Sequence, residues 1–171
     1  MPNHVTNKLT ILGNEKEINE VLELVRSDDR LFDFNNIIPT PDDIFQGSVG
    51  SEEEKKYSGK TWYTWNRENW GTKWNAYDIK LENDTIIFDT AWSTPLPVIT
   101  ALSKLFQNIS FELEYADEDM GHNLGVSTFN NGDIVETTEF YQGSERAIKF
   151  ACYVKGYDYD QYLEDMQEMG L

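Results

Sequence analysis

Hydrophobic and polar residues alternate at the start of the chain and then change to a helical period. Over residues 4–12 every second side chain, Val5 to Ile11, belongs to one predicted buried face, which indicates a half-buried strand. Asn14 followed by Glu17 is the signature of a helix capping box, and residues 18–25 carry apolar side chains at helical spacing. A strand followed directly by an amphipathic helix is typical of a βαβ unit.

The pattern continues with further strands, hairpins and helices. The predicted strands are 31–38, 75–81, 85–92, 109–115, 124–129 and 134–140. Ser93-Thr94-Pro95 predicts a helix start with a hydroxyl cap, and Asn130-Asn131-Gly132 predicts a hairpin turn. The segment from Gly143 to Cys152 fits a helix or a strand, and Tyr162 to Met169 fits a short closing helix.

This order predicts an α+β fold: a ferredoxin-like antiparallel sheet with helices on one face, an inserted Trp-rich segment, an extra hairpin and a C-terminal helix. At 171 residues we expect a single ferredoxin-like domain over 1–171. Within it we expect a loop-rich insertion at about 40–74 and a C-terminal extension at about 143–171.

Tryptophan is the most distinctive residue type of the chain. All five tryptophans fall within residues 62–92, four of them in the Gly- and Asn-containing stretch 62–78. Flat rings beside amides and cations suit a groove for a small ligand or a nucleobase, and a Trp-rich mini-core is the structural alternative. The residues predicted to bind a ligand are Trp65, Asn66, Asn69, Trp70, Lys73 and Trp74.

The chain is strongly acidic, and its charge is unevenly distributed. Fourteen Lys and Arg residues stand against thirty-one Asp and Glu, a formal net charge of −17. No Lys or Arg occurs from Leu105 to Glu145, where nine carboxylates lie. Such a surface repels phosphate backbones, so we expect no direct nucleic-acid binding; it attracts a basic partner, or it serves solubility alone. The predicted acidic partner-binding face is Glu112, Glu114, Asp117, Glu118 and Asp119.

Sequence motifs of enzymes are absent. There is no nucleophile elbow, phosphate-binding loop, His-Glu-x-x-His or Cys-x-x-Cys motif, and the single cysteine, Cys152, lies among apolar neighbours. The carboxylates at 117–119 with His122 fail the calcium-loop spacing, because Gly121 falls one place early and Thr128 stands where Glu is needed. We therefore predict no catalytic residue, cofactor or metal. The enzyme alternative is a metal-assisted hydrolase using this acidic cluster.

The expected compartment is the cytoplasm. A single cysteine forms no internal disulfide, no long apolar run is present, and the first residues lack the regions of a secretory signal.

Five short sequences occur in a fixed order: Met1-Pro-Asn-His-Val-Thr-Asn-Lys-Leu9, Phe34-Asn-Asn-Ile-Ile-Pro39, Glu68-Asn-Trp-Gly-Thr-Lys-Trp-Asn75, Ala91-Trp-Ser-Thr-Pro95 and Tyr115-Ala-Asp-Glu-Asp119. In them the chain resembles the YubB-like ferredoxin-fold family, small proteins of phages, plasmids and other mobile elements. The resemblance covers about residues 1–145. It implies a ferredoxin-like fold in a bacterial mobile-element setting and no catalytic role for any residue.

These observations predict a mobile-element accessory protein that acts as a non-catalytic binding module. The expected partner is a basic host protein, which the acidic face would engage as a nucleic-acid mimic. The alternatives are ligand binding in the Trp/Asn groove and the metal-assisted hydrolase. The sequence indicates neither the oligomeric state nor the conformation of residues 40–60.

Overall fold

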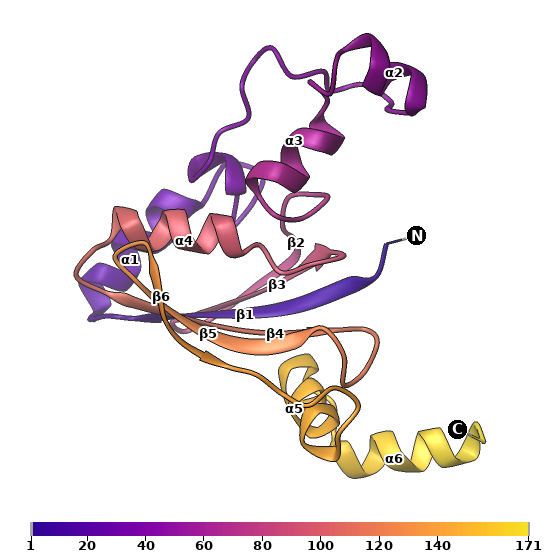
Figure 1. Cartoon of the computed structure of the whole chain (residues 1–171). Coiled ribbons are helices and arrows are strands. Elements are labelled where there is room, and N and C mark those ends of the chain that lie inside the picture. The colour runs from indigo at the N-terminus through magenta and orange to yellow at the C-terminus, as the bar shows by residue number, and fades with distance from the viewer. Residues whose placement is uncertain (1, 171) are drawn as a thin grey trace.

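The computed structural model describes residues 2–170, which form a six-stranded antiparallel sheet with helices on both sides (Figure 1). The strands are β1 (His4–Leu12), β2 (Tyr77–Glu82), β3 (Thr85–Ala91), β4 (Ser110–Asp117), β5 (Leu124–Asn130) and β6 (Asp133–Thr138). The helices are α1 (Glu15–Val25), α2 (Ser51–Lys56), α3 (Trp62–Asn69), α4 (Leu96–Leu105), α5 (Glu145–Lys155) and α6 (Tyr159–Glu168), with a short 3-10 helix η1 (Phe34–Asn36).

The strands lie in the order β2-β3-β1-β4-β5-β6. The first four of these, with α1 and α4, make a β-α-β-β-α-β unit whose helices lie on one face of the sheet (Figure 1). The hairpin of β5 and β6 adds two strands beyond β4. The predicted α+β antiparallel fold is therefore confirmed.

The first strand and helix form as their patterns predict. Val5, Leu9 and Ile11 are buried on one face of β1. Asn14 accepts a hydrogen bond from the backbone N–H of Glu17, and the Glu17 carboxylate accepts one from the backbone N–H of Asn14. The predicted capping box is thus confirmed, and it satisfies two donors that the helix itself leaves unpaired.

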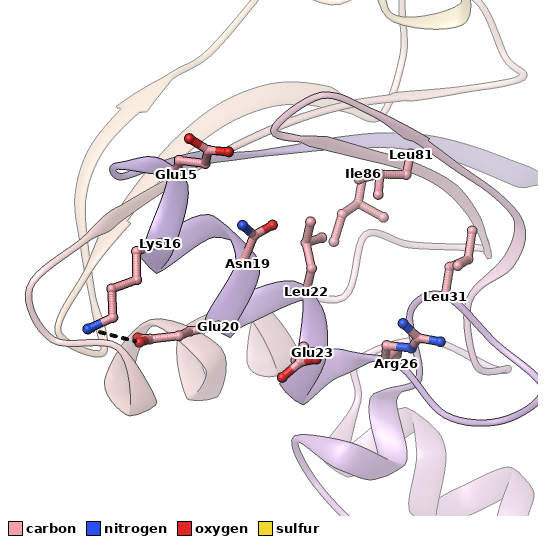
Figure 2. Close-up of a pocket in the computed structure, with 10 residues that line it drawn as sticks. All are labelled: Glu15, Lys16, Asn19, Glu20, Leu22, Glu23, Arg26, Leu31, Leu81 and Ile86. Atoms are coloured by element: carbon pink, nitrogen blue, oxygen red, sulfur yellow. Dashed lines mark ion pairs between the residues drawn. The ribbon is translucent and has the colours of Figure 1, made fainter.

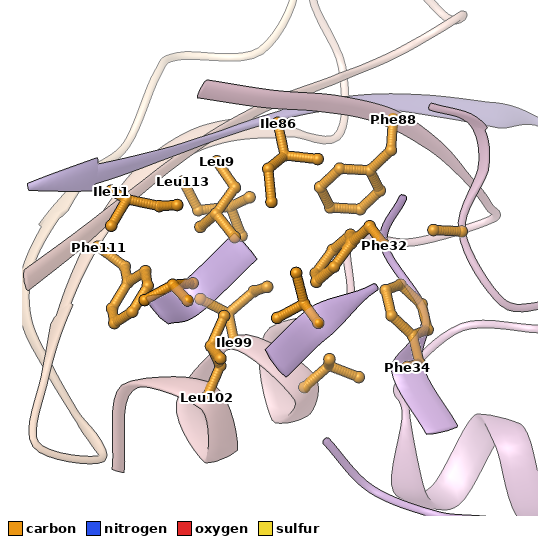
Figure 3. Packing of buried hydrophobic residues seen from close by; sticks show 14 of the residues in the cluster. Leu9, Ile11, Phe32, Phe34, Ile86, Phe88, Ile99, Leu102, Phe111 and Leu113 are labelled. Atoms are coloured by element: carbon orange, nitrogen blue, oxygen red, sulfur yellow. The ribbon is translucent and has the colours of Figure 1, made fainter. Parts of the chain in front are cut away.

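The main hydrophobic core lies between the sheet and helices α1 and α4 (Figure 3). Phe32 and Phe34, from the segment after α1, enter this core and meet Phe88 of β3 edge to face, with ring centroids 4.8 and 6.1 Å apart. All three rings are fully buried, and burying one such side chain stabilises the fold by about 1.5–3 kcal/mol.

The strand predicted over residues 31–38 is wrong, because this segment contains η1 instead. The alternating pattern arose because Phe32 and Phe34 both enter the core. The backbone N–H groups of this segment donate to side chains and to nearby backbone carbonyls and not to a neighbouring strand. The Phe34 N–H donates to Oδ1 of Asn75 at 3.0 Å, the Asn35 N–H donates to the Asp33 side chain at 2.9 Å, and the Ile37 N–H donates to the Phe34 carbonyl at 3.0 Å. Such local side-chain bonds compete with sheet pairing.

The segment between α1 and β2 contains η1, α2 and α3, and α2 and α3 lie beyond α4 on the side away from the sheet (Figure 1). The ring of Phe45 stacks on that of Tyr57, with the ring centroids 4.2 Å apart. The Phe45 N–H donates to the carbonyl of Lys60, and the Phe45 carbonyl accepts from the N–H of Trp62. These contacts hold the short helix α2 against the start of α3.

Helix α5 covers the other face of the sheet (Figure 1). Its residues Ala147, Ala151 and Val154 pack on Ala116 and Leu124 in a second, smaller core. The segment that fits either a helix or a strand by its sequence is therefore helical, and the predicted closing helix is confirmed as α6. Among residues 2–170, no helix combines the length and apolar character needed to cross a membrane.

Candidate functional site

Three of the five tryptophans have structural roles. Trp70 is only 4% exposed, and its indole N–H donates to the carbonyl oxygen of Ile38 at 2.9 Å. Trp65 packs on the main core and meets Trp70 edge to face at 5.3 Å. The indole of Trp62 donates to the carbonyl of Gly47 at 2.9 Å. The mini-core alternative therefore describes this part of the Trp segment.

The predicted amides also bond within the protein. Asn66 is buried and donates to the carbonyl oxygen of Lys73, and Asn69 donates to that of Trp65, both at 2.9 Å. A polar cleft of about 620 Å³ lies beside Asn66, Trp70 and Trp74. Most of the polar side chains on this wall are already used by the fold, so few of them are free to select a ligand.

Two other tryptophans are exposed and lie on either side of a lysine. Trp74 is 37% exposed and Trp92 is 40% exposed, and Nζ of Lys73 lies 4.7 Å from the ring centroid of each. Tyr63 of α3 meets Trp92 edge to face at 6.2 Å, and the guanidinium of Arg67 lies 5.2 Å from the Tyr63 ring. We call these five residues the aromatic patch. Arg67, Lys73 and Trp92 also line a shallow pocket of about 370 Å³.

The backbone of Trp92 is in the left-handed region, with φ of 75°. This conformation costs a residue other than glycine roughly 1–2 kcal/mol. Hydrogen bonds hold it: the Trp92 N–H donates to the carbonyl of Asn3 at 2.9 Å, and its own carbonyl accepts from the side-chain amide of Asn123 at 3.2 Å. The carbonyl of Ala91, just before it, accepts from the hydroxyl of Thr72 at 2.7 Å.

A buried polar network supports the other side of this turn. Asn7, fully buried in β1, donates to the hydroxyl of Thr90 at 2.9 Å and accepts from the hydroxyl of Thr94 at 2.7 Å. Thr90 in turn donates to the carbonyl of Ser93 at 2.8 Å. The hydroxyl cap predicted for α4 is therefore wrong, because the Thr94 hydroxyl bonds to Asn7 and the cap position is occupied by Pro95.

Gly71 brings the end of α3 against the same turn. Its φ is 76°, and a Cβ at this position would lie 2.8 Å from Cδ of Pro97. The hydroxyl of Ser93 donates to the Gly71 carbonyl. A side chain at position 71 would therefore strain the backbone and push α3 away from the turn that carries Trp92.

The predicted acidic face is not one open surface. Glu112 and Glu114 lie on the α5 side of β4, where the hydroxyl of Tyr153 donates to Glu114 at 3.2 Å. Burial raises the pKa of Glu114 above its usual value, and the bond from Tyr153 opposes that shift. Glu118 and Asp119 are exposed in the turn after β4.

Asp117 is a structural residue. It is 4% exposed, and its carboxylate accepts hydrogen bonds from the side-chain amides of Asn3 and Asn123 and from the backbone N–H of Asp119. Because Asn3 and Asn123 also hold the backbone of Trp92, this carboxylate organises the turn beneath the aromatic patch.

The acidic cluster gathers no ligand set for a metal. Within residues 2–170, no three His, Cys, Asp or Glu side chains come together in a group that could hold a metal ion. His122 Nδ1 lies 3.5 Å from the Asp119 carboxylate. Both carboxylate oxygens of Asp117 already accept hydrogen bonds from side-chain amides.

The sequence prediction placed Arg67, Lys73 and Trp74 in the groove but named neither Tyr63 nor Trp92. A signal for Trp92 was present, since it is the one tryptophan outside the Trp-rich stretch and directly precedes a helix start. Its exposure and its left-handed backbone depend on distant residues, however, and no local pattern shows them.

Comparison with known proteins agrees with the observed topology. A family model described as the ferredoxin-like domain in Api92-like protein matches residues 69–166. The chain belongs to this family. The ferredoxin-like fold predicted from the sequence is thereby confirmed. The matched region of the Api92-like family includes Lys73, Trp74 and Trp92, whereas Tyr63 and Arg67 precede it.

A solved structure has the same general fold. Protein api92 from Yersinia pseudotuberculosis superposes with a TM-score of 0.51 at 9% sequence identity, over 84% of this chain and 100% of that one. At this identity the likeness shows the fold alone. None of the curated proteins matches this chain. The Api92-like family is described by a fold and by no reaction.

Proposed function

We propose that this Api92-like protein is a non-catalytic binding module whose specific contact surface is the aromatic patch. The observation that carries the proposal is Trp92, a large exposed ring on a strained backbone that a hydrogen-bonded network holds in place. Strained residues cluster at ligand clamps and switch regions, and Trp, Tyr and Arg are the residue types enriched in interface hot spots. The aromatic patch combines both features.

The partner that fits this surface is a protein. Trp74 and Trp92 are each more than a third exposed, so their rings form a surface for a partner to cover and do not enclose a ligand. Lys73 and Arg67 supply donors beside the rings, which suits carbonyl or carboxylate groups on the facing surface of the partner.

The net charge of the chain indicates which class of protein the partner belongs to. At −17 the chain attracts a protein that is basic overall, and a nucleic-acid-binding protein engaged by mimicry is one such protein. The YubB-like resemblance supports a phage or plasmid origin, with a bacterial host protein as the target.

The test is capture from bacterial lysate by the immobilised protein at about 50 and 500 mM salt, a range over which surface charges become screened. Trp92→Gly removes the ring and also the left-handed strain, so binding falls without loss of the fold. Tyr141→Ala is the matched control, because Tyr141 is 85% exposed and lies outside the aromatic patch.

We expect one partner to be retained by the wild type and by Tyr141→Ala and lost with Trp92→Gly. Loss of that partner at high salt supports the basic-partner version of the proposal. Equal capture by Trp92→Gly and the wild type, with both melting alike, would remove the aromatic patch as the contact surface.

A further inference from the structure

Helix α6 carries an apolar stripe whose outer half is exposed within the described residues 2–170. The stripe follows helical spacing through Tyr159, Tyr162, Leu163 and Met166. The first turn packs on α5, where Nζ of Lys149 lies 4.9 Å from the Tyr159 ring centroid. Beyond this contact the helix runs outward from the sheet (Figure 1), and no residue of α6 is fully buried.

The outer half of this stripe is accessible. Leu163 is 36% exposed and Met169, one residue past the helix, is 64% exposed, while Met166 between them is half-buried. An apolar stripe on a helix normally packs against another element. On α6 the apolar stripe continues beyond the part of the helix that packs on α5 (Figure 1).

Charge identifies the kind of partner that this helix suits. The carboxylates of α6 are Asp160, Glu164, Asp165 and Glu168, and the helix has no Lys or Arg. By helical spacing Asp160 and Asp165 lie on opposite edges of the stripe, whereas Glu164 and Glu168 lie toward the back of the helix. A partner helix that packs on the stripe therefore meets carboxylates along both of its edges.

We propose that α6 docks a basic amphipathic helix of a partner protein. The two apolar stripes pack against each other, and Lys or Arg side chains of the partner reach the flanking carboxylates. The helix is about 15 Å long, so the contact is small and its affinity is salt-dependent. The inference rests on the proposed binding function, but it uses a surface separate from the aromatic patch.

A second copy of the chain is a poorer occupant. An apolar groove of about 810 Å³ lies between α1 and β2, and Leu22, Leu81 and Ile86 point into it (Figure 2). Carboxylates of α1 line its rim: Glu15, Glu20 and Glu23. Lys16 of the same rim is already paired with Glu20 at 3.7 Å. Three carboxylates face the two cations Lys16 and Arg26, so the rim stays net acidic and suits an acidic α6 from another copy poorly.

The probe is a blocked, fluorescently labelled 14-residue peptide of Leu and Lys, with Leu at helical stripe positions. It is titrated into the full chain at about 50 and 500 mM salt and followed by anisotropy, and amide NMR shifts map the contact. We expect shifts over residues 158–170 and at least tenfold weaker binding to Asp160→Lys/Asp165→Lys, the two carboxylates that flank the stripe. Leu163→Ser, which changes no charge, should also weaken binding.

The matched control is Glu136→Lys/Glu139→Lys, which changes the net charge equally at exposed residues in and beside β6. It should alter binding less than twofold. Equal weakening by both double variants, or NMR shifts outside α6, would show general charge attraction and overturn the inference. A concentration-dependent dimer that Leu163→Ser abolishes would assign the stripe to a second copy and overturn it too.

The variant Trp92→Gly separates the two proposals. It should leave binding of the Leu/Lys peptide unchanged, because the aromatic patch takes no part in it. If the peptide still binds α6, while Trp92→Gly captures the lysate partner as well as the wild type does, the aromatic-patch proposal alone is wrong. If the peptide binds the α6 variant and the control variant equally well, while lysate capture still depends on Trp92, the α6 inference alone is wrong.

Discussion

Replacing Trp92 with alanine or with glycine measures the strain in the turn that carries the aromatic patch. Both variants lose the same ring contacts with Tyr63 and Lys73. They differ in how the new residue accepts a φ of 75°. Alanine keeps a Cβ and keeps the left-handed penalty of roughly 1–2 kcal/mol, whereas glycine has no such penalty.

The expected difference in stability follows from two opposing effects. Glycine loses more conformational freedom on folding, which costs about 0.5–1 kcal/mol relative to alanine. Subtracting the middle of this range from the middle of the strain range leaves Trp92→Gly more stable than Trp92→Ala by about 0.75 kcal/mol. At a position with ordinary backbone geometry the order is reversed. For a chain of this length, about 1 kcal/mol moves Tm by about 2–4 °C.

Urea and thermal unfolding, followed by circular dichroism, give the two free energies. Circular dichroism is preferred to fluorescence because the variants remove a tryptophan. An alanine variant as stable as the glycine variant, or more stable, would refute the claim that position 92 is strained. It would also withdraw the main physical argument for the aromatic patch as a functional surface.

Three further substitutions test the surroundings. Asn7→Ala leaves the buried Thr94 hydroxyl without its acceptor, so urea unfolding should show a loss of roughly 1–3 kcal/mol. Gly71→Ala places a Cβ 2.8 Å from Pro97 and should lower Tm and change the near-UV dichroism of the tryptophans. Burial raises the pKa of Glu114, so the charged carboxylate is less stable in the folded state and acidification favours folding. Glu114→Gln should therefore have a Tm at or above that of the wild type at pH 7. This difference in Tm should be smaller at pH 5.

Much of the fold could be predicted from the sequence, because a buried face repeats at a fixed period. The alternation in β1, the capping box at Asn14 and the hairpin turn at Asn130-Asn131-Gly132 are local features, and each appears where it is expected. The same rule failed at residues 31–38, because Phe32 and Phe34 enter the core from a segment whose backbone bonds to side chains.

The site was harder to predict, because its parts are brought together by distant residues. The strained backbone of Trp92 depends on Asn3 and Asn123, which lie far from it in the sequence. Asp117 was expected on an acidic surface, and three hydrogen-bond donors hold it in the interior. Periodicity describes which face of an element is buried, but it does not show which loops meet.

The central position of β1 has a consequence for how the protein folds. β1 pairs with β3 on one side and β4 on the other, so Leu9 lies opposite both Ile86 and Leu113. Pairs so distant along the chain close large loops, and folding slows as such long-range contacts dominate. A fragment restricted to the matched residues 69–166 would lack β1 and leave two unpaired strand edges in the middle of its sheet. Truncation at the boundary of the match should therefore yield an aggregating chain, because the two halves of its sheet are joined only through β1.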